Sequence, residues 1–201
     1  MLNFENTFQR LIQNPQFLFT FLIGGLLCFV PVLNFFALGY LYRMTKRLRA
    51  TGSLSLPEWD NLRSLFLDGI RLLIVFLIYA FLPMTLGFII ASTLFPGLNY
   101  NSPNFVLAFF RIFSLALFCS ALYRFQRSQN FYALLDFKFI LKMALILLQS
   151  QFIVLVACYG LFFLFLPLYG FAIFAVLLVS LIQTTGYFYQ LDIKGKVWTV
   201  F

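Results

Sequence analysis

The feature that most constrains the fold of this chain is the length of its uncharged apolar runs. Residues 143–191 contain no Asp, Glu, Lys or Arg, and neither do residues 17–42 and 72–95. A transmembrane helix needs about 20 consecutive apolar residues, so the first run is long enough for two membrane crossings. With 63% hydrophobic and 10% charged residues, the chain has too much apolar surface for a soluble core of this size. The sequence therefore predicts an all-α protein, a polytopic transmembrane helical bundle with amphipathic interfacial helices.

The order of the runs predicts a single membrane domain over residues 1–201. Its transmembrane helices are expected at residues 72–95, 105–123, 143–166 and 168–190. Residues 1–16 place apolar side chains at helical spacing among polar ones. This pattern is typical of an amphipathic segment that lies on the membrane surface.

Residues 17–42 have two possible arrangements. A continuous helix of this length would reach about 39 Å, more than the ~30 Å hydrocarbon core, and Pro31 interrupts it. One arrangement is a single kinked span with the N-terminus outside. The other is a hairpin that turns near residues 31–34 and has both ends inside. We favour the hairpin, because it keeps the N-terminal segment and Arg10 on the cytoplasmic side.

The basic residues predict the orientation in the membrane. Apart from Arg10 and Arg111, all Lys and Arg side chains fall in residues 43–71, residues 124–142 or the tail after residue 191. By the positive-inside rule these segments, including the C-terminus, are cytoplasmic. A net charge of +8 could suggest nucleic-acid binding in a soluble protein. Here every basic segment adjoins a membrane helix, so we expect anionic lipid and no nucleic acid.

The cytoplasmic or interfacial segment 43–71 contains the densest set of polar side chains. Arg43, Lys46 and Arg47 share one face of a helix, and with Trp59 as an aromatic anchor they are expected to contact lipid at the interface. Thr51-Gly52-Ser53 is expected to end that helix. The segment Ser55-Leu-Pro-Glu58 has capping-box spacing, which predicts that the next helix starts there.

The residues after Trp59 alternate with the period of an amphipathic helix. Its apolar stripe consists of Leu62, Leu65, Phe66, Gly69, Ile70 and Leu73. Its opposite, polar stripe consists of Asp60, Asn61, Ser64, Asp68 and Arg71. We expect this helix to lie in the interface and to lead into the span at residues 72–95. Pro83 and Gly87 predict a kink in that span.

Four charged residues of this segment are candidates for a structural or partner-binding motif. Glu58 and Asp60 could form a binding or acid–base pair, but side chains at this spacing more commonly cap a helix. Asp68 and Arg71 could pair with each other, or Asp68 could pair with Arg43 or Arg47. Such pairs are expected to clamp the loop to the bundle, and a gate is the alternative.

A solute path is the second kind of candidate site. Arg111 is a charge inside a predicted span, where it could contact an anion, reach the headgroups or make a structural hydrogen bond. Gln149 and Gln183 belong to polar clusters inside two other spans. They could line a path or join two helices by hydrogen bonds.

The residue types exclude several kinds of chemistry. The chain has no His, which removes histidine-based metal and acid–base sites. Cys28, Cys119 and Cys158 stand alone in apolar runs, and no C-x-x-C motif occurs. We therefore expect no catalytic residues, no metal and no cofactor.

The central part of the chain, over about residues 15–90, resembles the DUF4013 family of prokaryotic integral membrane proteins. The resemblance is carried by Leu38-Gly39-Tyr40, Leu56-Pro57-Glu58-Trp59-Asp60, Leu67-Asp68-Gly69 with Arg71, Ile78-Tyr79 and Pro83. It implies location in a prokaryotic inner membrane and a shared design for these elements. It implies no catalytic residue, because the family has no established function.

Together these patterns predict a non-enzymatic integral membrane protein. We expect an accessory or scaffold subunit whose segment 43–71 contacts anionic lipid and a membrane protein partner. The alternative is a small homo-oligomeric channel or transporter for a small solute or anion, which the interrupted helices near Pro31 and Pro83 favour.

Overall fold

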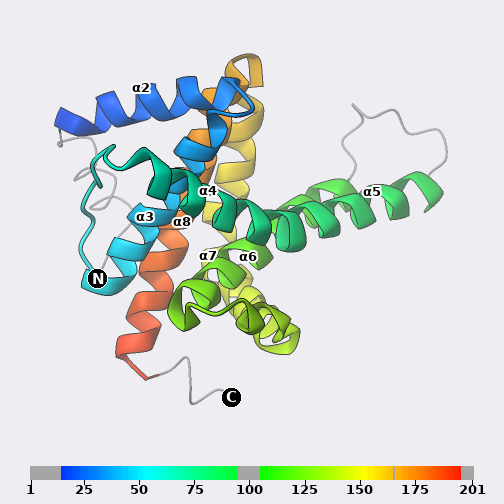
Figure 1. Cartoon of the computed structure of the whole chain (residues 1–201). Helices are drawn as coiled ribbons and strands as arrows, with labels where there is room; N and C mark the ends of the chain where they lie inside the picture. The colour runs from blue at the N-terminus through cyan, green and yellow to red at the C-terminus, as the bar shows by residue number, and fades with distance from the viewer. Residues whose placement is uncertain (1–14, 95–104, 165, 196–201) are drawn as a thin grey trace. The chain divides into compact units, whose positions relative to one another are not determined.

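The computed structural model describes residues 15–94, 105–164 and 166–195 (Figure 1). All regular elements in these ranges are helical, which confirms the predicted all-α class. Within them, four helices are long and apolar enough to cross a membrane: Leu62–Thr93, Phe105–Ser128, Phe137–Phe163 and Tyr169–Ile193. The amphipathic segment predicted for residues 1–16 lies outside the described residues except for its last two positions.

The chain forms two compact units. The first contains residues up to Leu73 and residues from Gly160 onward, and the second contains Ile74–Tyr159. The first unit includes α2 (Pro15–Phe29), α3 (Asn34–Thr51), the first part of α4 (Leu62–Phe76) and α8 (Tyr169–Ile193). The second includes the π-helical turn η1 (Leu77–Phe81), α5 (Leu82–Leu94), α6 (Phe105–Ser128), the short η2 (Phe131–Leu135) and most of α7 (Phe137–Leu164).

In the first unit, the uncharged run 17–42 is divided between two helices. α2 ends at Phe29 and α3 begins at Asn34, so the break falls on the Pro31 region. Proline lacks the N–H that a continuous helix would need at this point. The hydroxyl oxygens of Thr20 and Tyr40 are 3.5 Å apart, which shows that α2 folds back beside α3.

α3 runs along α8 in the same direction, as Figure 1 shows for the cyan and red helices. At one end, the Tyr169 hydroxyl donates to the carbonyl of Phe29, the last residue of α2, at 3.1 Å. At the other end, Gly52 lies against the ring of Tyr189. Gly52 has a φ of 68°, and its N–H donates to Leu48 at 2.8 Å. This left-handed cap confirms the predicted end of α3.

α4 begins later than the capping-box pattern predicts. Its first residue is Leu62, and residues 54–58 have no helical structure, so the start predicted at Ser55–Glu58 is wrong. The side chain of Asn61 accepts a hydrogen bond from the N–H of Ser64 at 3.3 Å, which is the geometry of an N-cap. Residues 59–61, just before α4, contact α3 through interactions that are described below.

Two helices of the second unit depart from regular α geometry. Next to Pro83, where the sequence predicts a kink, η1 forms a π-helical turn in which the N–H of Leu82 donates to the carbonyl of Leu77. Tyr79 in this turn donates to the carbonyl of Leu134 in η2. α7 is interrupted at Gln151, whose φ and ψ are −124° and 21°. Such departures interrupt the regular hydrogen bonds of the helix backbone.

Candidate functional site

The candidate site lies in the first unit, where α3 crosses α4 at two glycines. A Cβ atom added to Gly39 would lie 1.9 Å from the carbonyl oxygen of Leu65. A Cβ added to Gly69 would lie 1.9 Å from the carbonyl oxygen of Phe35. The two backbones therefore touch directly, which only residues without a side chain allow. This crossing brings together the two glycine-containing motifs, Leu38-Gly39-Tyr40 and Leu67-Asp68-Gly69.

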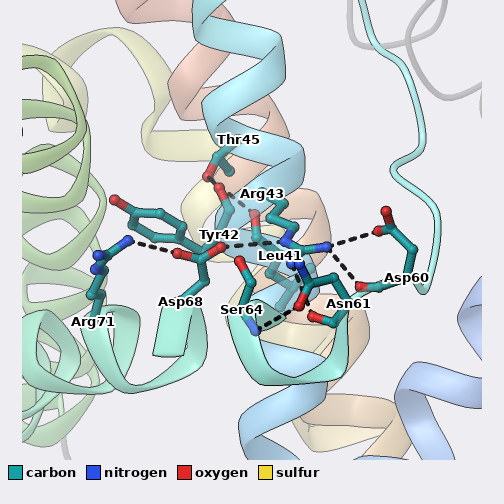
Figure 2. Close-up of polar contacts among 9 residues, drawn as sticks. All are labelled: Leu41, Tyr42, Arg43, Thr45, Asp60, Asn61, Ser64, Asp68 and Arg71. Carbon is teal, nitrogen blue, oxygen red and sulfur yellow. Dashed lines mark hydrogen bonds and ion pairs between the residues drawn. The ribbon is translucent and has the colours of Figure 1, made fainter. Parts of the chain in front are cut away.

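Charged side chains flank the crossing and join the same two helices. Arg43 Nε donates to Asp68 Oδ2 at 3.3 Å, and Arg71 Nη1 donates to Asp68 Oδ1 at 2.8 Å (Figure 2). The side chains of Arg43 and Asp68 are only 15% and 12% exposed. A carboxylate that is largely removed from water is costly without partners, and here each oxygen has one. Of the ion pairs predicted from the sequence, Asp68 therefore forms two, one with Arg71 and one with Arg43.

The same arginine also fixes the loop that leads into α4. Arg43 Nη1 donates to the carbonyl and to Oδ1 of Asp60, both at 3.0 Å, and Nη2 donates to the carbonyl of Asn61 at 3.3 Å. Figure 2 shows this guanidinium between the loop on one side and Asp68 on the other. Because the guanidinium is planar and has five N–H donors, one side chain can bind all of these acceptors. We call Arg43, Asp60, Asp68 and Arg71 the α3–α4 clamp.

An aromatic stack gives the loop a further attachment. The rings of Trp59 and Tyr40 lie 4.3 Å apart between centroids with an interplanar angle of 17°. Trp59 is half-buried, and its indole nitrogen has no hydrogen-bond partner among the described residues. The predicted role of Trp59 at the lipid interface stays a prediction. The structure shows that one face of its indole ring is used for contact with α3.

Burial on α4 does not follow the two predicted stripes. Asp68 of the polar stripe is buried, whereas Leu62 of the apolar stripe is 60% exposed. The reason is the glycine crossing: α3 approaches α4 over Gly69, so the adjacent Asp68 is enclosed next to Arg43. Leu65 and Leu72 are buried as well, so the interior-facing side includes both apolar and charged positions.

Other predicted residues of segment 43–71 remain at the surface. Glu58 is exposed and forms no ion pair with any residue that the structure describes, and the side chain of Asp60 is 64% exposed despite its bond to Arg43. Lys46 and Arg47 are exposed on α3. The end of the loop at residues 59–61 is thus held against α3, while the carboxylates of Glu58 and Asp60 are exposed.

The residues of the predicted solute path lie in both units. In the second unit, Arg111 Nη1 donates to the Tyr159 hydroxyl at 3.0 Å, and the guanidinium carbon is 5.9 Å from the centroid of that ring. Gln149 is exposed on α7, two residues before the interruption at Gln151. Gln183 belongs to α8 in the first unit and is half-buried. Arg111 therefore has a structural partner of the kind that the sequence offered as one alternative.

The residues of the clamp make structural contacts with one another. Within the described ranges, no group of three or more His, Cys, Asp or Glu side chains could hold a metal ion. Both carboxylate oxygens of Asp68 are bound by arginines. What the clamp can do is hold α3 against α4 and fix the conformation of the loop between them.

Two contributors to this site are absent from the sequence-based candidates. Tyr40 was named only as part of a family motif, and in the structure its ring stacks on Trp59. Asn61 caps α4, offers its carbonyl to Arg43 and has a φ of 49°. Asn tolerates this left-handed conformation better than most residues and is a common N-cap. Asn61, directly before the apolar Leu62, was therefore a detectable signal for the helix start.

Comparison with known proteins found no matching curated protein and no matching solved structure. The model of one protein family, described as a protein of unknown function (DUF4013), matches residues 22–183. This match covers most of the chain and extends into α8, beyond the central motifs that first suggested the resemblance. Three motifs of that resemblance, those around Gly39, Trp59 and Asp68, meet at the α3–α4 crossing. The chain belongs to the DUF4013 family.

Proposed function

We propose that this protein is a non-enzymatic component of a prokaryotic inner membrane, an accessory or scaffold subunit that binds a membrane protein partner through the loop of residues 52–61. The observation that carries the proposal is the way this loop is held. Arg43 binds two of its carbonyls and one carboxylate, and Tyr40 stacks on Trp59. A loop fixed in advance loses little conformational entropy when a partner binds.

The chemistry of the loop indicates how a partner would recognise it. Glu58 is exposed next to the stacked Trp59, and the Asp60 carboxylate is mostly exposed. An aromatic side chain beside accessible charges is typical of a binding hot spot with a polar rim. The complementary surface on the partner would therefore carry a basic side chain opposite Glu58.

Copurification from native membranes in mild detergent tests this proposal. The wild-type protein is expected to retain a stoichiometric partner that mass spectrometry identifies. Glu58→Lys should lose the partner, because it reverses the charge at the contact without touching the clamp. Lys194→Glu reverses an exposed charge outside the loop and serves as the control that keeps the partner. Wild-type protein that purifies only with copies of itself would contradict the accessory role.

The proposal includes contact with anionic lipid through the basic face of α3. Lys46 and Arg47 are exposed and lie at the end of the helix that precedes the loop. Each basic side chain near an anionic membrane surface contributes about 1 kcal/mol to the attraction. In native mass spectrometry, Lys46→Gln with Arg47→Gln should retain less anionic phospholipid than the wild type and the same amount of zwitterionic lipid. Equal retention of anionic lipid would contradict this part of the proposal.

A channel or transporter is the second candidate, and the interrupted helices of the second unit favour it. η1 is a π-helical turn within an otherwise α-helical run, and α7 breaks at Gln151 beside the exposed Gln149. Discontinuous helices with polar residues are characteristic of many transporter binding sites. Solute flux by the purified protein in liposomes would support this function. Flux that is unchanged in Gln149→Ala and Arg111→Leu would remove these residues from the path.

A further inference from the structure

The geometry points to a further role for the α2–α3 hairpin: we propose that it is inserted among the acyl chains of the bilayer and that both of its ends lie on one side of the membrane. By the hairpin we mean α2, α3 and the turn of residues 30–33 between them. The surface involved is the outer face of α2 together with this turn. The proposal concerns a different surface from the 52–61 loop and does not depend on its function.

The surface of the hairpin is apolar, so its contact with water is unfavourable. On α2, Leu18, Phe19 and Leu26 are at least 60% exposed. The turn itself reads Val-Pro-Val-Leu, and its Val32 is 65% exposed. Turns that face water are dominated by Gly, Asn, Asp and Ser, because these residues supply local hydrogen bonds or left-handed conformations. No charged residue occurs between Arg10 and Arg43, so the whole tip is free of charge.

Several backbone groups at the turn have hydrogen-bond partners within the protein. The N–H of Val30 donates to Leu27 at 3.3 Å, and the N–H of Asn34 donates to Val30 at 2.9 Å. At the end of α2, the Phe29 carbonyl accepts the Tyr169 hydroxyl at 3.1 Å. Irregular backbone is tolerated at membrane depth only where protein groups replace water as partners. This turn is supplied with such partners by its own helices and by α8.

The dimensions and direction of the two arms place their ends on the same side. α2 has 15 residues, which gives about 22 Å of helix and falls short of a ~30 Å hydrocarbon core. Thr20 of α2 meets Tyr40 of α3 several residues from the turn in each arm, so α2 packs against α3 and does not continue in line with it. α2 is anchored on α8, where Gly24 lies against the ring of Phe174 and Gly25 against the ring of Phe171. The arms therefore enter and leave the lipid together.

Spin-label accessibility in liposomes tests contact with acyl chains. Single cysteines are introduced as Val32→Cys and Leu22→Cys after the native cysteines are replaced. Each variant is used as full-length protein and must melt at the same temperature as the wild type. Leu86→Cys on a candidate span is the lipid-exposed control, and Ser53→Cys in the loop is the water-exposed control. Nitroxides at residues 22 and 32 should resemble residue 86, with collisions with oxygen favoured several-fold over a polar nickel complex. A Val32→Cys label that resembles Ser53→Cys would overturn the proposal.

Side-specific labelling tests the common side of the two ends. Asn6→Cys and Ser53→Cys are treated with a membrane-impermeant maleimide in intact and in permeabilised cells. Both should react only after permeabilisation. Reaction of residue 6 in intact cells, with residue 53 still protected, would show that the segment crosses the membrane once and would overturn the hairpin. These readouts do not depend on any partner, so their failure is distinguishable from failure of the proposed scaffold function.

Discussion

Replacing Gly39 by alanine should separate α3 from α4 and open the clamp. The added Cβ would lie 1.9 Å from the Leu65 carbonyl oxygen and 2.8 Å from its carbonyl carbon, whereas ordinary contacts begin at 3.4 Å. Both of these atoms belong to the backbone, so rotation of a side chain cannot relieve the overlap. The helices must move apart by about 1.5 Å at this point, because closely packed interiors have no spare volume.

The cost follows from the contacts that this displacement breaks. Overpacking of a well-packed contact typically costs about 1–3 kcal/mol. The bond between Arg43 Nε and Asp68 Oδ2 is already 3.3 Å long, and separating the helices would bring it out of hydrogen-bond range. Loss of a hydrogen bond to a charged group adds about 1.5–3 kcal/mol, partly offset by relaxation, so we expect a total near 3 kcal/mol. By the scaling for soluble chains of this size, this lowers Tm by about 6–12 °C.

Thermal unfolding in mild detergent, followed by tryptophan fluorescence, measures this effect. Trp59 is a suitable reporter because it stacks on Tyr40, the residue next to Gly39. The matched control is Gly160→Ala in α7, where the added Cβ meets no heavy atom within 4 Å. The control should melt like the wild type or higher, since Ala favours a helix over Gly by up to about 1 kcal/mol. Equal melting of the two variants would refute the close crossing.

Three further changes test the clamp and the loop. Asp68→Asn should destabilise the protein by about 2–3 kcal/mol and Arg71→Gln by less than about 1 kcal/mol, because only the first removes a largely buried charge. A lower melting temperature for Arg71→Gln than for Asp68→Asn would contradict this. Arg43→Lys should raise deuterium uptake in residues 52–61 and leave α8 unchanged, since one ammonium cannot bind all the acceptors. Gly52→Ala should lower Tm by a few degrees, because the left-handed φ of this residue and the Tyr189 ring both disfavour a side chain. The unfavourable backbone conformation alone costs about 1 kcal/mol.

The sequence by itself determined the class of the protein and several local features. Long uncharged runs require helices, because a lipid environment leaves backbone groups no other partners. The end of α3 was readable at Thr51-Gly52-Ser53, since a left-handed cap depends on neighbouring residues only. The motifs around Gly39, Trp59 and Asp68 were visible as separate elements. These features share one property: the physics that produces them acts within a few residues of the chain.

The tertiary structure decided how those elements meet. Arg43 binds acceptors 17 and 25 residues further along the chain. These distant contacts hold the end of the loop against α3, and the preceding residues 54–58 do not form the helix that the capping-box pattern predicted. The burial of Asp68 likewise follows from the approach of α3 over Gly69, which helical periodicity within α4 cannot reveal. A local pattern specifies which conformations a segment prefers. The segment adopts its preferred conformation unless contacts from elsewhere in the chain stabilise a different conformation more strongly.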